Sequence, residues 1–166
     1  MFTKSLLISF IIFAWGISPG FCSFKNRTYQ EVLDTKYKNC KLKKENIFLT
    51  KKQVATVRKV LDVKISALLL RYQNSCDNSV AYVDSHIVRT LNETVIIEIK
   101  DKKINWIEIA SFMEPREYIP PKKWLNLLKD KRSNVDSLTG ATISENALKR
   151  LVQKYIVINN LLNEKN

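Results

Sequence analysis

The chain has 166 residues, of which 45% are hydrophobic and 27% are charged, so its composition excludes a disordered or fibrous protein and fits one globular domain. Its net charge of +12 indicates an anionic partner such as nucleic acid, a lipid surface, a phosphate-bearing cofactor or an acidic protein. A lysine-rich solvated surface accounts for the same charge, because no run of like charges reaches five residues. Composition alone leaves the function open.

The first 22 residues have the layout of a secretory signal. Lys4 precedes an apolar run from Leu6 to Ile17, and small residues with a helix breaker follow. This run is too short to span a bilayer comfortably. We therefore expect export, to the periplasm or the outer face of the cytoplasmic membrane. Cleavage after Gly20 or after Cys22, a lipid on Cys22 (disfavoured by Phe21 before it) and a retained anchor all remain open.

Residues 23–45 are expected to form a helical extension, with helical character from Tyr29 to Lys38, ahead of a main domain at 46–166. Once the signal is removed, two cysteines remain, Cys40 and Cys76. In an oxidising compartment they could form a disulfide that stabilises the fold by roughly 3–4 kcal/mol, or they could be two buried thiols. The sole histidine, His86, is expected in a strand, so neither a zinc site nor a histidine-dependent triad is predicted.

The main domain begins with a predicted helix, because Thr50 and Gln53 match a capping box. Its apolar face comprises Val54, Val57, Val60 and Leu61. Four strands are then predicted, over Lys64–Tyr72, Val80–Arg89, Thr94–Lys100 and Ile104–Phe112. The last two are joined by a short polar hairpin connection, Asp101-Lys102-Lys103.

Two helices are predicted after the strands. Pro120 and Pro121 introduce a short helix through Leu128, with Pro121 suited to its first turn. The final helix runs from about Ile143 to Leu162. Its apolar face comprises Ile143, Ala147, Leu148, Leu151, Val152, Tyr155 and Ile156. These elements predict an α+β fold, a small antiparallel sheet with packed helices.

The segment Asp136-Ser-Leu-Thr-Gly-Ala-Thr142 holds the only glycine outside the signal, Gly140. Thr142 directly precedes the final predicted helix and Glu145 follows three residues later, so spacing alone predicts a second capping box. Glycine also permits a close approach by another backbone or by a ligand.

This segment resembles the flavinylation motif of the FMN-binding domain family, found in subunits of ion-pumping quinone and ferredoxin oxidoreductases. The family pattern is an acidic residue, two variable positions, Ser or Thr, Gly, Ala, and finally Thr or Ser, and every fixed position is met here. Upstream, the run Phe112-Met-Glu-Pro-Arg-Glu-Tyr118 is similar to the Glu-Pro-x-x-Tyr region of the family, and a helix containing Trp124 follows. The likeness covers roughly residues 46–160. Arg116 and Glu117 stand where relatives often have a glycine.

The resemblance implies an FMN-binding-domain-like fold in which Thr142 carries covalent FMN through a phosphoester bond. The resemblance also implies that a dedicated FMN transferase outside the cytoplasm would donate the FMN from FAD. Asp136, Thr139, Gly140 and Ala141 would shape the attachment loop. Further residues expected near the flavin are Glu114, Tyr118 and Trp124.

The expected function is that of an exported, membrane-associated electron carrier or redox-complex component rather than a stand-alone enzyme. It would relay electrons between membrane or periplasmic redox proteins, without metal or nucleic acid. Two alternatives remain: a non-redox cationic module that binds a membrane surface or polyanion, and a family member that is never flavinylated.

Overall fold

The computed structural model describes residues 24–62, 65–131, 134–136 and 140–164. It contains one five-stranded antiparallel sheet in which each strand pairs with the next along the chain, in the order β1-β2-β3-β4-β5. The strands are β1 (Leu42–Phe48), β2 (Leu68–Asn74), β3 (Val80–Ile87), β4 (Asn92–Lys100) and β5 (Lys103–Phe112). The helices are α1 (Tyr29–Lys36), α2 (Lys51–Leu61), η1 (Arg116–Tyr118), α3 (Lys122–Lys131) and α4 (Thr142–Asn163). The predicted α+β class with an antiparallel sheet is confirmed.

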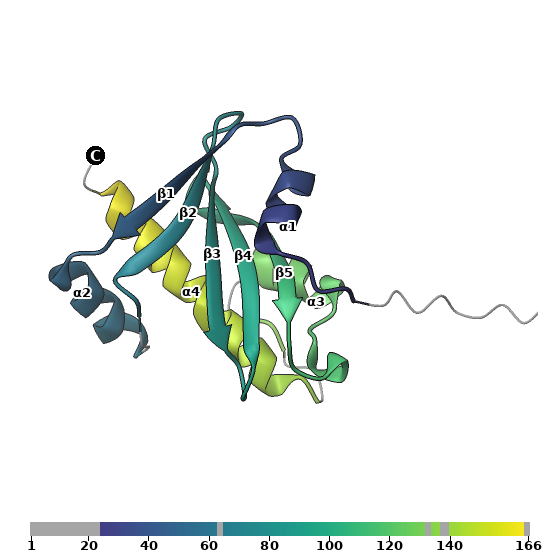
Figure 1. The fold of residues 1–166 in the computed structure, drawn as a ribbon. Coiled ribbons are helices and arrows are strands. Elements are labelled where there is room, and N and C mark those ends of the chain that lie inside the picture. Colours follow the sequence, from purple (N-terminus) through teal and green to yellow (C-terminus); the bar gives the residue numbers. More distant parts are fainter. Residues whose placement is uncertain (1–23, 63–64, 132–133, 137–139, 165–166) are drawn as a thin grey trace, which may run out of the picture.

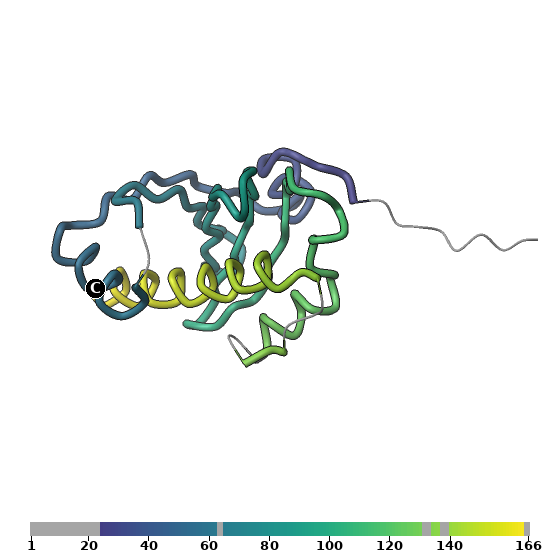
Figure 2. Tube along the Cα trace, turned by 90° about the horizontal axis from the view of Figure 1, so that it is seen from below, coloured from purple at the N-terminus to yellow at the C-terminus, as the bar shows by residue number. Residues whose placement is uncertain are grey.

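Helices cover both faces of the sheet (Figure 1). The larger core joins one face of the sheet to α2, α3 and α4, and includes Tyr82, Leu128 and Leu148. The smaller core joins the other face to α1 through Val32 and Leu33. In Figure 2, which is turned by 90° from Figure 1, α4 runs along the face of the sheet opposite to α1. Because both faces are buried, β4 reads as an almost continuous apolar run instead of alternating with polar residues.

Local sequence signals account for the ends of several elements. At α2, Thr50 Oγ1 accepts from the N–H of Gln53, and the N–H of Thr50 donates to Gln53 Oε1, so the predicted capping box is confirmed. Between β4 and β5, Asp101 and Lys102 have φ of 50° and 61°, the left-handed pair that a tight two-residue hairpin turn requires. The predicted hairpin is therefore also confirmed.

Other expectations need correction. β1 was not predicted, and it crosses residue 45, so the expected helical extension ends in a strand of the main sheet. Val60 and Ile143 were assigned to apolar helix faces but are 60% and 48% exposed, because each lies beyond the edge of the stripe that contacts the core. Pro121 precedes the first residue of α3, and its carbonyl accepts from the N–H of Leu125. Residue 64, the expected start of β2, lies outside the described residues.

Cys40 and Cys76 form a disulfide, with their Cα atoms 5.7 Å apart, which decides between the two alternatives for these cysteines. The bond joins the segment before β1 to the turn after β2. α1 is fixed by a buried polar contact, in which Tyr37 Oη donates to Glu98 Oε1 on β4 at 2.7 Å. No helix in the described part of the chain has both the length and the apolar character needed to cross a bilayer.

One feature of the sheet shapes the candidate site. β3 pairs with β4 along its whole length, from Val80 to Ile87. Its pairing with β2 covers only Val80 to Val83. Among the described residues, the part of β3 from Asp84 onward thus has no partner on the β2 side, and α4 runs behind the sheet in the view of Figure 1.

Candidate functional site

The described part of the flavinylation-like motif comprises Asp136 and residues 140–142; Thr139 lies outside the described residues. Asp136 is exposed, and Ala141 is buried at 5% exposure. Gly140 has φ +94°, a conformation that side chains disfavour, and a Cβ built there would meet no heavy atom within 4 Å. The glycine is therefore required by backbone conformation at an open turn rather than by crowding within the protein.

Thr142 is the first residue of α4, and its side chain is exposed. The helix cap is Ala141, whose carbonyl accepts from the N–H of Glu145 at 3.0 Å, and no side chain caps the helix. The predicted capping box at Thr142 is therefore wrong. The helix starts one residue earlier than that prediction required, so Thr142 already has a helical position and its hydroxyl takes no part in capping.

The start of α4 suits a phosphate group attached to Thr142. The first N–H groups of a helix lack acceptors within the helix, and together with the helix dipole they favour a negative charge. The hydroxyl of Ser144, two residues further on, is fully buried and has no hydrogen-bond partner among the described residues. An exposed hydroxyl beside unfilled donors is the arrangement that a phosphoester needs, so the residues present fit the group that the resemblance implies.

Trp124 connects α3 to the motif. Its side chain is 2% exposed, and its indole Nε1 donates to the main-chain carbonyl of Asp136 at 3.0 Å. Lys149 of α4 lies over the same ring, with Nζ 5.9 Å from the ring centre. Trp124 thus packs between α3, α4 and the beginning of the motif.

Glu114 and Tyr118 instead hold the turn between β3 and β4. Glu114 Oε1 accepts from the N–H groups of Thr90 and Leu91, at 2.7 and 2.8 Å. These two hydrogen bonds, that from Thr90 foremost, lower the pKa of the Glu114 carboxyl. The Arg89 guanidinium lies 3.9 Å from the centre of the Tyr118 ring. No contact recorded among the described residues joins Glu114 or Tyr118 to Thr142, so the expected site residues form two groups.

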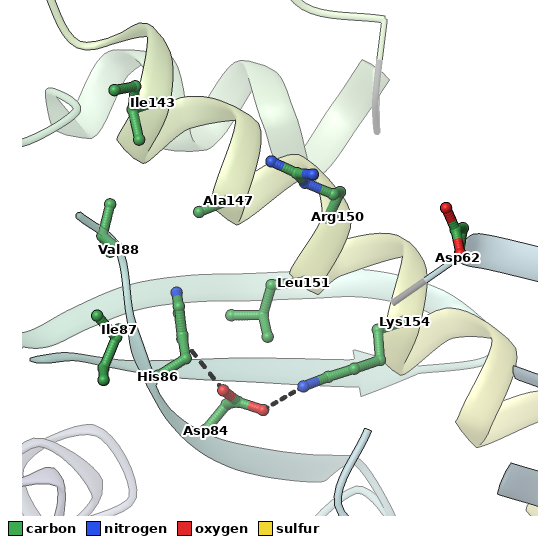
Figure 3. Close-up of a pocket in the computed structure, with 10 residues that line it drawn as sticks. All are labelled: Asp62, Asp84, His86, Ile87, Val88, Ile143, Ala147, Arg150, Leu151 and Lys154. Atoms are coloured by element: carbon green, nitrogen blue, oxygen red, sulfur yellow. Dashed lines mark hydrogen bonds and ion pairs between the residues drawn. The ribbon is translucent and has the colours of Figure 1, made fainter. Parts of the chain in front are cut away.

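A pocket of about 320 Å³ lies between β3 and α4, along the part of β3 that no longer pairs with β2 (Figure 3). It includes Asp84 and His86 of β3 and Ile143, Ala147, Arg150 and Lys154 of α4. Its volume is at the lower end of the range for small-molecule sites. The pocket begins at Ile143, the residue next to Thr142.

Charged side chains form a network on the inner wall of this pocket. Asp84 Oδ2 accepts from Lys154 Nζ and from Tyr155 Oη, at 2.5 and 2.7 Å. Asp84 Oδ1 contacts His86 Nδ1 at 3.1 Å. His86 Nε2 lies 3.2 Å from Glu93 Oε2, although the two atoms are not aligned for a hydrogen bond.

Burial and ion pairing shift the pKa values of these groups in opposite directions. Burial alone would raise the pKa of Asp84, but His86 and Lys154 outweigh it and hold this pKa well below its usual range. Burial likewise opposes a charged His86, yet Asp84 and Glu93 raise its pKa to about 9. For Glu93 burial dominates and raises the pKa. At neutral pH the wall therefore combines an ionised Asp84 with a protonated His86.

The sequence correctly placed His86 in a strand, but it gave no indication of this network. Asp84 and His86 are two residues apart on β3, so their side chains lie on the same face of the strand, and this spacing is the one local sign of the network. Lys154 comes 70 positions after Asp84, so no motif spacing links the two residues. No cluster of three metal-ligating side chains occurs in the part of the chain that the structure describes.

Comparison of the chain with protein-family models, with curated protein sequences and with solved structures finds no match.

Proposed function

We propose that this protein is an exported electron-transfer flavoprotein, with FMN joined covalently to Thr142 through a phosphoester. It relays electrons between redox partners at the cell envelope, as an electron carrier or redox-complex component rather than a stand-alone enzyme. The flavin supplies the redox chemistry, while the protein holds it and sets its electrostatic surroundings.

The observation that carries this proposal is the position of Thr142. Its residue type and its place in the segment from Asp136 to Thr142 match the flavinylation motif at every fixed position. It is exposed at the first position of α4, and its hydroxyl is not used in capping the helix. An attacking hydroxyl is thereby open to an enzyme, and the product phosphate would lie at a helix N-terminus.

Attachment of FMN to Thr142 is a phosphoryl transfer in which one phosphorus–oxygen bond forms and another breaks. The Thr142 hydroxyl oxygen attacks the phosphorus of the FMN half of FAD, and the phosphorus–oxygen ester bond forms. The pyrophosphate bond of FAD breaks, AMP leaves, and the hydroxyl proton passes to a base of the FMN transferase. No oxidant or reductant is needed. Only a hydroxyl side chain can make this bond, so serine is the single conservative substitution for Thr142.

Covalent attachment suits an exported protein, because a diffusible cofactor would be lost outside the cytoplasm. The apolar run of the predicted signal agrees with such a location. The positive charge of the chain would favour docking to an acidic redox partner and would speed association at low salt.

The test is coexpression of the full chain with an FMN transferase, followed by denaturation and intact-mass measurement. We expect wild-type protein to gain the mass of FMN minus water and to retain yellow colour after denaturation. Thr142→Ser should keep the increment, and Thr142→Ala should lose it.

If Thr142 instead had a buried structural role, the Thr142→Ala variant would be less stable than wild type. Thr142→Ala, at an exposed position, should match wild type in circular dichroism and thermal midpoint when both lack flavin. Absence of the increment on wild-type protein, or its persistence in a folded Thr142→Ala variant, would overturn the proposal. A colourless protein that binds anionic vesicles in a salt-dependent manner would favour a cationic binding module instead.

A further inference from the structure

Resting on the proposed function, we infer that the pocket between β3 and α4 holds the isoalloxazine ring of the flavin attached to Thr142, with Arg150 beside its pyrimidine edge. The inference concerns where the ring lies and which side chain tunes it. The flavinylation motif specifies the attachment point alone.

The flavin arm is long enough to bring the ring from Thr142 to this pocket along α4. An α-helix rises about 1.5 Å per residue, so Ala147 and Arg150 lie roughly 7.5 and 12 Å along the axis from Thr142. A ribityl phosphate arm of about seven single bonds spans on the order of 8 Å, the length of two Cα–Cα steps. A ring at the end of this arm therefore arrives level with Ala147 and Arg150. Both residues line the pocket, and Ile143 lines the end nearest the attachment point (Figure 3).

The shape and lining of the pocket also suit a flat aromatic ring. α4 presents Ala147 at its centre, where a small side chain leaves room against β3, while Ile143 and Leu151 supply apolar surface on either side. Ile143 is 48% exposed although it stands among the apolar positions of the helix. An aromatic ring in the pocket would cover this otherwise exposed side chain.

The charged side chains of the pocket differ in whether they already have a partner. Lys154 and His86 are already paired with Asp84. Arg150 is exposed, its Nε donates to the carbonyl of Asn146, and it has no acidic partner within ion-pair distance in the described part of the chain. The pyrimidine edge of a flavin accepts hydrogen bonds and gains negative charge on reduction, so a guanidinium beside it stabilises the reduced form. Asp62 also lines the pocket, but no ion pair within 4.0 Å joins it to Arg150 among the described residues, so Arg150 is the pocket cation that can contact the cofactor.

The side of α4 that faces Trp124 has fewer free groups that could contact the flavin ring. There Trp124 is buried, its N–H is used by Asp136, and Lys149 lies over its face. Glu114 and Tyr118 hold the turn between β3 and β4, and Val88 at the start of that turn lines the pocket. These residues therefore act as positioning residues that shape the surroundings of the ring.

The first experiment changes the charge on flavinylated protein. Arg150→Gln should lower the flavin midpoint potential, by about 30 mV for each tenfold weakening of two-electron reduction. Lys44→Gln, which removes the same charge from an exposed position of β1, should leave the potential within a few millivolts of wild type. Equal potentials in wild type and Arg150→Gln would overturn the assignment of Arg150.

The second experiment fills the pocket. Ala147→Trp should keep the FMN mass increment, because Thr142 is untouched, but should expose the ring to iodide quenching and weaken its visible circular dichroism. Thr35→Trp, at an exposed position of α1 on the other face of the sheet, should leave both signals unchanged. An Ala147→Trp variant that keeps the increment with wild-type quenching and circular dichroism would contradict the inference.

Failure of the inference differs from failure of the proposed function. If wild-type protein lacks the FMN increment, the proposed function fails. If the increment is present while Ala147→Trp and Arg150→Gln both behave as wild type, the function stands and this location of the ring is wrong. Because Arg150 is exposed, Arg150→Gln should fold normally even if the bulkier Ala147→Trp does not.

Discussion

The indole N–H of Trp124 donates to the carbonyl of Asp136, and this hydrogen bond of 3.0 Å ties α3 to the first residue of the flavinylation-like motif. The bond fixes the start of the segment that leads to Thr142. It links a packed part of the core to the exposed residue at which the motif begins, so the position of this residue depends on a buried side chain from α3.

Trp124→Phe tests this link. The variant keeps most of the ring packing but loses the hydrogen bond, so we expect a loss of about 1 kcal/mol in the free energy of unfolding, measured by urea denaturation. We also expect slower flavin incorporation during coexpression. Trp106→Phe is the matched control, because in the described part of the chain the Trp106 ring contacts Tyr37, Lys36 and the smaller core without an indole hydrogen bond. Equal incorporation rates in the two variants would show that the Trp124 bond does not position the motif.

The disulfide gives a second prediction. Cys40 and Cys76 are 36 residues apart, so the loop that they close is long enough for the bond to stabilise the fold by about 3–4 kcal/mol. The double variant Cys40→Ser, Cys76→Ser should lose about this much in chemical denaturation. Wild-type protein under reducing conditions should show the same loss, and the variant should not respond to reductant. An unchanged midpoint on reduction would contradict the prediction.

Glu114 provides a third prediction, because its carboxylate accepts from the N–H groups of Thr90 and Leu91. Glu114→Ala should speed hydrogen exchange at these two amides and lower the thermal midpoint. Glu117→Ala, an exposed neighbour, is the control and should leave both unchanged. Since the folded pKa of Glu114 is lowered, its contribution is present above the ordinary carboxyl pKa and is lost as the pH falls through the lowered value.

His86 gives the opposite dependence on pH. The groups that face it are Asp84 on its own strand and Glu93 on β4, with Lys154 and Tyr155 of α4 on the far side of Asp84. Its folded pKa of about 9 is above its ordinary value, so the stability that it contributes is complete below pH 6.5 and is lost as the pH rises toward 9.

The measurement is the free energy of unfolding between pH 6 and pH 9.5. We expect wild type to lose roughly 1–3 kcal/mol across this range. His86→Gln should be less stable at pH 6 and should lack most of the slope. A wild-type profile that is flat, or that rises with pH, would be inconsistent with a charged His86 between two carboxyls.

Much of the fold was predictable because its signals are local. The capping box at Thr50 and Gln53 and the polar turn at Asp101 and Lys102 each lie within a few residues, and the structure agrees with both. β1 was missed because three of its seven residues are charged and its side chains are mostly partly or fully exposed, so it lacks the apolar pattern of a buried strand. Its pairing with β2 stabilises it, and that pairing is not visible in its own sequence.

The candidate site likewise has one part that depends on neighbouring residues and another that depends on residues far apart in the chain. The segment ending at Thr142 is contiguous, so its likeness to a family motif could be stated from the sequence alone and stays a prediction, while the predicted start of α4 was wrong by one residue. The pocket depends on the separation of β2 from β3 and on contacts between Asp84 and Lys154, which are far apart in the chain. Such contacts arise from tertiary packing, so the pocket and the role inferred for Arg150 could be found only with the structure.

The central claim is the bond between FMN and Thr142, and peptide mapping tests it most directly. Trypsin should release residues 133–149 as one peptide, because no lysine or arginine lies between Arg132 and Lys149. In flavinylated wild-type protein, fragmentation of this peptide should place the mass of FMN minus water on Thr142. An increment on Ser137, Thr139 or Ser144, or an unmodified peptide after coexpression with an active transferase, would contradict the account.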